Sequence, residues 1–127
     1  MNIKSSQTLI AEALKEVKTI TPEEALTLSK ENKCNLIDIR DAIELQKEGR
    51  IESSHHISRG LLEFAIHPQS PFAQNENIDF NKELVLFCAA GGRSALAAKT
   101  LKEIGFEKVS HIEGGFSSMK NKGFKVV

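Results

Sequence analysis

The chain has 127 residues, the size of a single domain with one hydrophobic core. Its 17 basic and 17 acidic residues give a formal net charge of zero, which excludes a global field that attracts nucleic acid or an anionic membrane. Only two cysteines, Cys34 and Cys88, are present, too few for a disulfide framework. We therefore expect a cytoplasmic protein with neither a nucleic-acid nor a membrane partner, in which any anion is bound by a locally organised site.

Residues 1–16 are predicted to form an amphipathic helix that packs on the domain, with its cap near Ser5 or Ser6. Glu12 and Glu16 interrupt its apolar residues, so the segment does not fit a secretory signal, a membrane span or an organelle presequence. Its polar face is of mixed sign, which favours a core-covering helix over a membrane or partner helix. The apolar positions at helical spacing are Leu9, Ile10, Ala13, Leu14 and Val17.

Residues 17–127 are predicted to form an α/β domain, because short apolar strands alternate with helices. Strands are expected at 17–20, 36–39, 56–57, 84–87 and 109–112. Helices are expected at 21–32, 42–48, 94–104 and 116–122. Residues 61–81 hold Pro68 and Pro71 and are predicted to be a helical turn followed by a long surface excursion. The alternation predicts a mainly parallel sheet with its ligand site at the carboxyl ends of the strands.

The segment Cys88-Ala89-Ala90-Gly91-Gly92-Arg93 lies between a buried strand and a helix and is the main candidate site. A cysteine attacks as the thiolate, so its surroundings must stabilise negative charge. Backbone N–H groups of the loop and the positive end of the helix dipole can converge on the sulfur, and the two glycines let consecutive amides turn inward. Arg93 adds a planar donor fork suited to sulfonate, phosphate or carboxylate oxygens.

Ser94 is expected to cap the following helix and to add a hydroxyl donor. The plainer interpretation is a buried structural Cys88 beside a surface Arg93, and for a lone cysteine it would be the better one. Here a buried strand, a cysteine, a glycine pair, Arg-Ser and a helix follow one another in the order that an anion cradle needs. The combination favours a nucleophilic cysteine.

The same residues resemble the rhodanese family, the single-domain sulfurtransferases. The family's active-site loop reads Cys-x-x-Gly-x-Arg-Ser and stands here as Cys88 to Ser94. Leu36-Ile37-Asp38-Ile39-Arg40, followed by Glu44, is similar to the family's Leu-Ile-Asp-Val-Arg element. His111-Ile112-Glu113-Gly114-Gly115-Phe116 is similar to its C-terminal Gly-Gly signature, so the resemblance covers roughly residues 17 to 122.

The resemblance implies a five-stranded parallel sheet flanked by helices on both faces, and a double-displacement reaction with ping-pong kinetics. Cys88 would take a sulfane sulfur from a small anionic donor, thiosulfate or a persulfide, and pass it from a persulfide to cyanide or a thiol, including the thiol of a protein. No metal or organic cofactor is implied. Cys88 and Arg93 are the expected catalytic residues. The expected substrate-binding residues are Ala89, Ala90, Gly91, Gly92, Ser94 and Arg59.

One family element is altered. The usual Gly-His-Ile-Pro-Gly-Ala appears as Gly49-Arg50-Ile51-Glu52-Ser53-Ser54, which lacks the residues that preset a turn, so a looser or differently shaped connection is expected. Met119 stands where many relatives carry Trp after the Gly-Gly signature and is expected in the core. Asp38 and Arg40 are expected to support the strand end by hydrogen bonding and by ion pairing with loop backbone or Glu44, in preference to contacting substrate.

The remaining sulfur and imidazole groups are expected to be structural. Cys34 begins the second strand and is interpreted as a small core residue in preference to a resolving thiol. His55 and His56 are adjacent, so in a strand they face opposite sides and do not share a metal ion. Neither His67 nor His111 is assigned a role, because sulfur transfer between soft nucleophiles needs no dedicated base.

Three other functions stay open at this point. A phosphatase or arsenate reductase would also use a cysteine in an arginine-closed loop, but the dual-specificity phosphatases of this fold use Cys-x5-Arg, whereas four residues separate Cys88 from Arg93. A rhodanese-like binding module without turnover is disfavoured by the presence of Cys88. A persulfide carrier that hands sulfur only to a protein partner remains compatible with the same loop.

Overall fold

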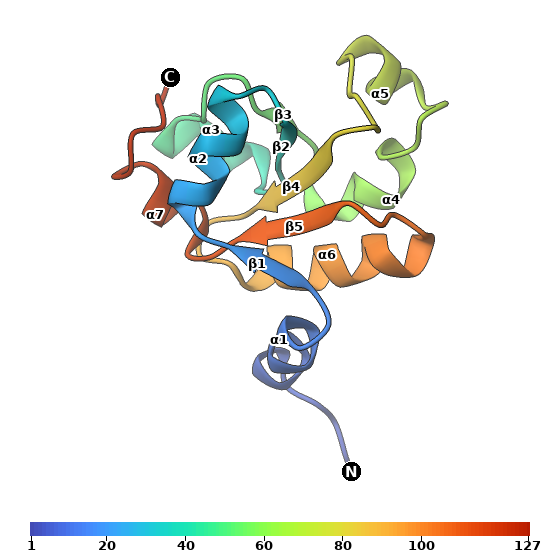
Figure 1. Cartoon of the computed structure of the whole chain (residues 1–127). Coiled ribbons are helices and arrows are strands. Elements are labelled where there is room, and N and C mark those ends of the chain that lie inside the picture. The colour runs from blue at the N-terminus through green and yellow to red at the C-terminus, as the bar shows by residue number, and fades with distance from the viewer.

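Five parallel strands form the centre of the computed structural model, which describes all residues from Met1 to Val127 (Figure 1). The strands are β1 (Lys18–Ile20), β2 (Cys34–Asp38), β3 (His55–His56), β4 (Glu83–Phe87) and β5 (Val109–Ile112). Their order across the sheet is β1-β5-β4-β2-β3, and every neighbouring pair is parallel. The prediction of a five-stranded parallel sheet is confirmed.

Helices cover both faces of this sheet, which confirms the second part of the prediction (Figure 1). The helices are α2 (Pro22–Lys30), α3 (Ala42–Glu48), α4 (Leu62–Ala65), α5 (Pro71–Asn75), α6 (Gly92–Ile104) and α7 (Gly115–Met119), with a 3-10 turn at Arg59–Leu61. Strand β4 shows why both faces are apolar: Leu84 and Leu86 pack with α4, α5 and α6, whereas Val85 and Phe87 pack with α2 and α7. Met119 belongs to this second cluster and is fully buried, as expected.

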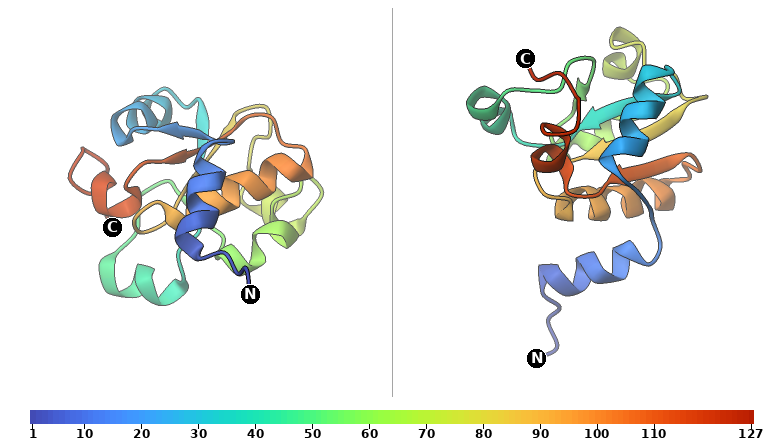
Figure 2. Two further views of the ribbon diagram at one scale, coloured as in Figure 1. Left: turned by 90° about the horizontal axis from the view of Figure 1, so that it is seen from below. Right: turned by 60° about the vertical axis from the view of Figure 1, so that its left-hand side comes forward.

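Helix α1 (Ser6–Leu14) lies outside α6, against the body of the domain (Figure 2). Ser5 caps it by accepting a hydrogen bond from the N–H of Thr8, and Ala13 is fully buried on its inner face. Ile10 approaches the start of α6, where its Cδ1 would lie 2.9 Å from a Cβ built on Gly92. None of the helices has the length and apolar character needed to cross a membrane.

Several element boundaries differ from the sequence expectation. Helix α6 begins at Gly92, two residues before the expected start, and α7 ends at Met119, before the expected end at residue 122. The excursion after the 3-10 turn holds a second helix, α5, which Ser70 caps by accepting from the N–H of Ala73. These residues form a helix because Ser70 provides the N-cap and Pro71 the first-turn proline.

The altered connection Gly49–Ser54 is differently shaped but not loose, because the C-terminal tail is paired with it. Ile51 forms an antiparallel bridge with Val126, and the backbones of Arg50 and Val127 exchange two hydrogen bonds of 3.0 and 2.8 Å. Gly49 takes a positive φ of 85°, and a Cβ there would lie 2.8 Å from a methyl group of Val126. Pairing with residues 125–127 therefore holds this connection in place.

Candidate active site

The loop of Cys88 connects the carboxyl end of β4 with the first turn of α6. The side chain of Cys88 is buried, and its Sγ accepts hydrogen bonds from the N–H of Gly91 at 3.1 Å and of Ser94 at 3.4 Å. Both donors belong to the N-terminus of a 13-residue helix, whose dipole places partial positive charge there. Two N–H groups and the positive end of the helix dipole therefore point at the sulfur.

Glycines give the loop the shape that aims these donors. Gly91 serves as the N-cap of α6. Its φ of 110° is a backbone conformation that residues other than glycine rarely adopt. On the other side, the carbonyl of Cys88 accepts from the N–H of Phe116 at 2.7 Å and the carbonyl of Ala89 from that of Ser117 at 3.1 Å. A Cβ on Gly115 would lie 2.3 Å from the carbonyl oxygen of Cys88, so the Gly-Gly signature lets α7 reach the loop.

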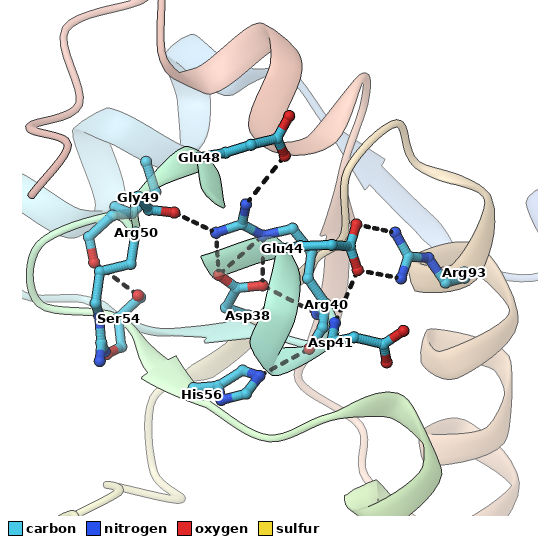
Figure 3. A network of polar contacts seen from close by, with 11 residues as sticks. Asp38, Arg40, Asp41, Glu44, Glu48, Gly49, Arg50, Ser54, His56 and Arg93 are labelled. Atoms are coloured by element: carbon cyan, nitrogen blue, oxygen red, sulfur yellow. Dashed lines mark hydrogen bonds and ion pairs between the residues drawn. The ribbon is translucent and has the colours of Figure 1, made fainter. Parts of the chain in front are cut away.

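Arg93 is held at the mouth of the loop by a bidentate ion pair with Glu44 of α3 (Figure 3). Its two guanidinium nitrogens lie 2.8 and 2.9 Å from the carboxylate oxygens. These hydrogen bonds lower the pKa of Glu44 from 4.5 to about 2 and raise the pKa of Arg93 above its ordinary value. The positive charge next to Cys88 is thus fixed in position and balanced by a carboxylate.

Of the two partners expected for Arg40, loop backbone or Glu44, the structure shows loop backbone, because Glu44 pairs with Arg93. Arg40 is fully buried and binds the carboxylate of Asp38, two residues earlier, through Nε and Nη2, with a closest distance of 2.8 Å (Figure 3). It also donates to the carbonyl of Gly49 at 3.0 Å, and its guanidinium stacks 3.9 Å from the ring centre of Phe116. A buried guanidinium needs a buried counter-charge, and Asp38 is the carboxylate that β2 buries with it.

Ser94 does not cap α6, contrary to expectation, because the N-cap position falls on Gly91. Its hydroxyl lies inside the helix start, 3.6 Å from Sγ of Cys88, 3.2 Å from the carbonyl oxygen of Gly91 and 2.9 Å from Nδ1 of His111. His111 is buried, and desolvation lowers its pKa from 6.5. The strand alternation of β5, which places Val109 and His111 on one face, was the signal that could have found this neighbour.

Arg59 is directed elsewhere in the structure. Its guanidinium lies 2.9 Å from the carboxylate of Glu63 and 3.2 Å from the hydroxyl of Thr100. Thr100 is seven residues beyond Arg93 on α6, about 10 Å along the helix axis at ~1.5 Å per residue. The observed contacts therefore do not bring Arg59 to Cys88, and its binding of an anionic donor stays a prediction.

Cys34 lies at the other end of the sheet from Cys88. It is paired in register with Glu83, which is five residues before Cys88 and therefore about 17 Å away at ~3.3 Å per residue. Burial and the nearby carboxylate of Glu83 raise its pKa to about 11. This placement agrees with a structural role. No group of three or more His, Cys, Asp or Glu side chains is arranged to hold a metal ion.

Two cavities differ in their relation to the loop. The larger, of about 350 Å³, is lined by residues 80–82, 84 and 105–108 at the amino ends of β4 and β5, away from the nucleophile. The smaller, of about 240 Å³, lies between α1 and the loop and is lined by residues 90–92, with Thr19 and His111 among its other walls. The smaller one is at the carboxyl edge of the sheet, where parallel α/β folds bind their ligands.

A family model for the rhodanese-like domain matches residues 21–122. The chain belongs to the rhodanese family. Among curated proteins it is similar to thiosulfate sulfurtransferase GlpE of Pseudomonas putida, with 32% identity over 103 residues that cover 81% of this chain and 84% of that protein. These relatives support a sulfurtransferase of the rhodanese type.

Two solved structures match most of the rhodanese chain, including α1. The polysulfide-sulfur transferase of Wolinella succinogenes has a TM-score of 0.74 and 32% identity, covering 95% of this chain and 85% of its own. A protein of unknown function from Rhodopseudomonas palustris, described as a possible tyrosine phosphatase, has a TM-score of 0.86 and 38% identity, covering 100% of this chain and 97% of its own. The fold therefore occurs both in a polysulfide-sulfur transferase and in a protein described as a possible tyrosine phosphatase.

Proposed function

We propose that this rhodanese moves a sulfane sulfur from a small anionic donor, thiosulfate or a persulfide, to a thiophilic acceptor through a persulfide on Cys88. The observation that carries the proposal is the sulfur of Cys88 held under two backbone N–H donors at the N-terminus of α6. The same donors stabilise the thiolate before the reaction and again when the thiolate is regenerated. The relatives named thiosulfate sulfurtransferase and polysulfide-sulfur transferase support this choice of chemistry.

The reaction needs no external oxidant. The Cys88 thiolate attacks the sulfane sulfur of thiosulfate, an S–S bond forms, and the bond to the sulfonate sulfur breaks with its electron pair leaving as sulfite. In the second half, cyanide or a thiolate attacks the terminal sulfur of the persulfide. The S–S bond to Cys88 then breaks, and its electron pair regenerates the thiolate for another cycle.

Arg93 supplies positive charge beside this sulfur. Its Nη1 and Nη2 each donate a hydrogen bond to the carboxylate of Glu44, so the side chain is held in one position. We propose that the guanidinium attracts the anionic donor while Glu44 keeps it in place. The pair uses two of the five N–H groups of the guanidinium, so the others are left for an anionic donor. What disfavours the phosphatase alternative is the spacing of four residues between Cys88 and Arg93, where the dual-specificity phosphatases have five.

The decisive experiment is intact-mass spectrometry after incubation with thiosulfate. We expect one added sulfur, about 32 Da, that cyanide then removes. Cys34→Ser is the matched control and keeps the addition, whereas Cys88→Ser loses both the addition and sulfur transfer. Arg93→Ala weakens use of the donor more than it weakens folding. Unaltered turnover in Cys88→Ser would refute the mechanism.

Two assays separate the remaining functions. Rapid hydrolysis of an aryl phosphate without any sulfur transfer supports the phosphatase, which the description of the Rhodopseudomonas palustris protein also suggests. Normal loading of Cys88 without thiosulfate:cyanide turnover supports a carrier that delivers sulfur to the thiol of a protein partner. A chain that neither loads nor turns over is a binding module.

A further inference from the structure

A continuous line of side chains leads from Cys88 to the surface behind the loop. Sγ of Cys88 lies 3.6 Å from Oγ of Ser94, which lies 2.9 Å from Nδ1 of His111. On the far side of the ring, Nε2 lies 2.8 Å from Oγ1 of Thr19. The first three residues are buried, and Thr19 is exposed on the edge strand β1. This line joins the candidate nucleophile to solvent without passing through the mouth of the loop.

We propose that His111 is a positioning residue that sets the direction of the Ser94 hydroxyl and, by changing tautomer, carries the thiol proton of Cys88 to solvent. The proposal rests on the proposed use of Cys88 as a nucleophile. It gives a role to a histidine that the sulfur-transfer chemistry itself does not require.

The two neutral tautomers of His111 match the two states of Cys88. With the thiol, S–H donates to Ser94 Oγ, the Ser94 hydroxyl donates to an unprotonated Nδ1, and Nε2–H donates to Thr19. The thiol proton then moves to Ser94 Oγ while the hydroxyl proton of Ser94 moves to Nδ1. This leaves a thiolate, a hydroxyl that donates to it, and a proton on Nδ1. The proton on Nε2 then leaves through Thr19 to water, and the ring is neutral again.

The surroundings of His111 keep the ring neutral in both states. It pairs in register with Thr19 of β1 and Leu86 of β4, neither of which is charged. Helix α6 presents the hydroxyl of Ser94, and the neighbouring loop presents the titratable thiol of Cys88. Helix α1 adds only apolar side chains to the cavity, where the single further ionisable group is Glu113, which is exposed.

The cavity under α1 completes the exit for the proton. It measures about 240 Å³ and is lined by both Thr19 and His111. A water molecule needs only ~10–15 Å³ of such a space together with polar partners, so the cavity can admit water to Nε2. The carbonyl oxygen of Gly91, 3.2 Å from Ser94 Oγ, competes for the same hydroxyl proton. His111 therefore matters, because an N–H at Nδ1 directs the hydroxyl away from the ring and toward the sulfur.

The test is the pH profile of Cys88 alkylation by iodoacetamide, followed by intact mass in a Cys34→Ser background. Ser94→Ala and His111→Leu are each expected to move the midpoint up by about one pH unit, a tenfold loss of thiolate at a given pH. His111→Asn is the matched control, because its side-chain amide can still donate to Ser94, and its midpoint stays within a few tenths of a unit of the parent. The double variant Ser94→Ala/His111→Leu shifts no further than Ser94→Ala.

A parental midpoint in His111→Leu, or additive shifts in the double variant, would overturn the proposal. His111→Gln serves if the leucine variant does not fold by circular dichroism, because its longer amide matches the Nε2 position and leaves Ser94 without a donor. Loading with thiosulfate in the same Cys34→Ser background separates the two proposals. Failure to load sinks the sulfur-transfer function, whereas normal loading with an unmoved midpoint sinks only the relay.

Discussion

Replacing Glu44 by Gln removes the charge that fixes Arg93 and leaves the rest of α3 nearly unchanged. The carboxylate of Glu44 also accepts from the backbone N–H of Asp41 at 2.8 Å, at the start of the helix. The amide oxygen of Gln can accept the same hydrogen bond, since Gln serves equally well at this position of a helix N-terminus. Glu44→Gln therefore isolates the ion pair from the cap.

The structure sets the size of the effect. A pKa of about 2 in place of 4.5 corresponds to at most ~3.4 kcal/mol, at about 1.36 kcal/mol per pKa unit. The side chain of Arg93 is 39% exposed and that of Glu44 is 25% exposed, so solvent screens the pair strongly. After this discount we expect Glu44→Gln to lower the free energy of unfolding by about 1 kcal/mol at pH 7. For a chain of this size the melting temperature falls by about 3–5 °C.

The pH dependence is the sharper part of the prediction. Because the pKa of Glu44 is lowered on folding, its contribution is fully present above pH 4.5 and is lost as the pH falls through about 2. Urea unfolding of the parent and of Glu44→Gln should differ from pH 7 down to about 5 and converge toward pH 2. A difference that is the same at pH 7 and pH 2 would show that the substitution acts through packing and not through the charge.

Three further substitutions or reactions test the fold around the site. Asp38→Asn leaves the buried Arg40 with only the half-exposed carboxylate of Glu48, 3.8 Å away, as a counter-charge and is expected to cost about 3 kcal/mol in urea unfolding. Gly115→Ala places a Cβ 2.3 Å from the carbonyl oxygen of Cys88 at a φ of 53°, so it is expected to abolish loading with thiosulfate and to cost more than about 1 kcal/mol. Cys34, with a pKa raised to about 11, is expected to react only slowly with iodoacetamide at pH 8, measured in Cys88→Ser.

Each of these has a control or an outcome that contradicts it. Gly105→Ala is the matched control for Gly115, because Gly105 also has a positive φ, 125°, but no atom lies within 4 Å of the added Cβ. It should destabilise the chain without affecting loading. A loss below about 1 kcal/mol in Asp38→Asn would mean that Arg40 finds water or another acceptor. Rapid alkylation of Cys34 at pH 8 would contradict its burial.

The order of residues around Cys88 was sufficient to predict a loop whose backbone N–H groups converge on the sulfur. Anion-binding loops depend on backbone N–H groups, and the glycines and the helix that supply these groups are contiguous with the cysteine in the chain. The sheet was predictable for a related reason, since alternating apolar strands and helices leave few ways to bury both faces. Helix α6 begins two residues earlier than predicted, because Gly91, and not Ser94, takes the N-cap position.

The partners of charged and imidazole groups were not predictable in the same way. Arg40 and Arg93 each had carboxylates within reach in the sequence, and only the packing of α3 shows that Glu44 binds Arg93 while Asp38 binds Arg40. The C-terminal pairing of Val126 with Ile51 is likewise a contact between distant segments. Long-range contacts of this kind depend on how elements pack, which a single sequence does not encode as a local pattern.

The sequence by itself determined that Cys88 follows a buried strand, precedes a helix and lies beside two glycines and an arginine, because these are neighbours in the chain. The tertiary structure alone decided which side chains pack against that loop from the sheet. His111 is 17 residues away from Ser94 along the chain and meets it only because β5 pairs with β4 beneath α6. A proton path needs donors and acceptors within hydrogen-bond distance, and that distance is fixed by strand register and helix packing.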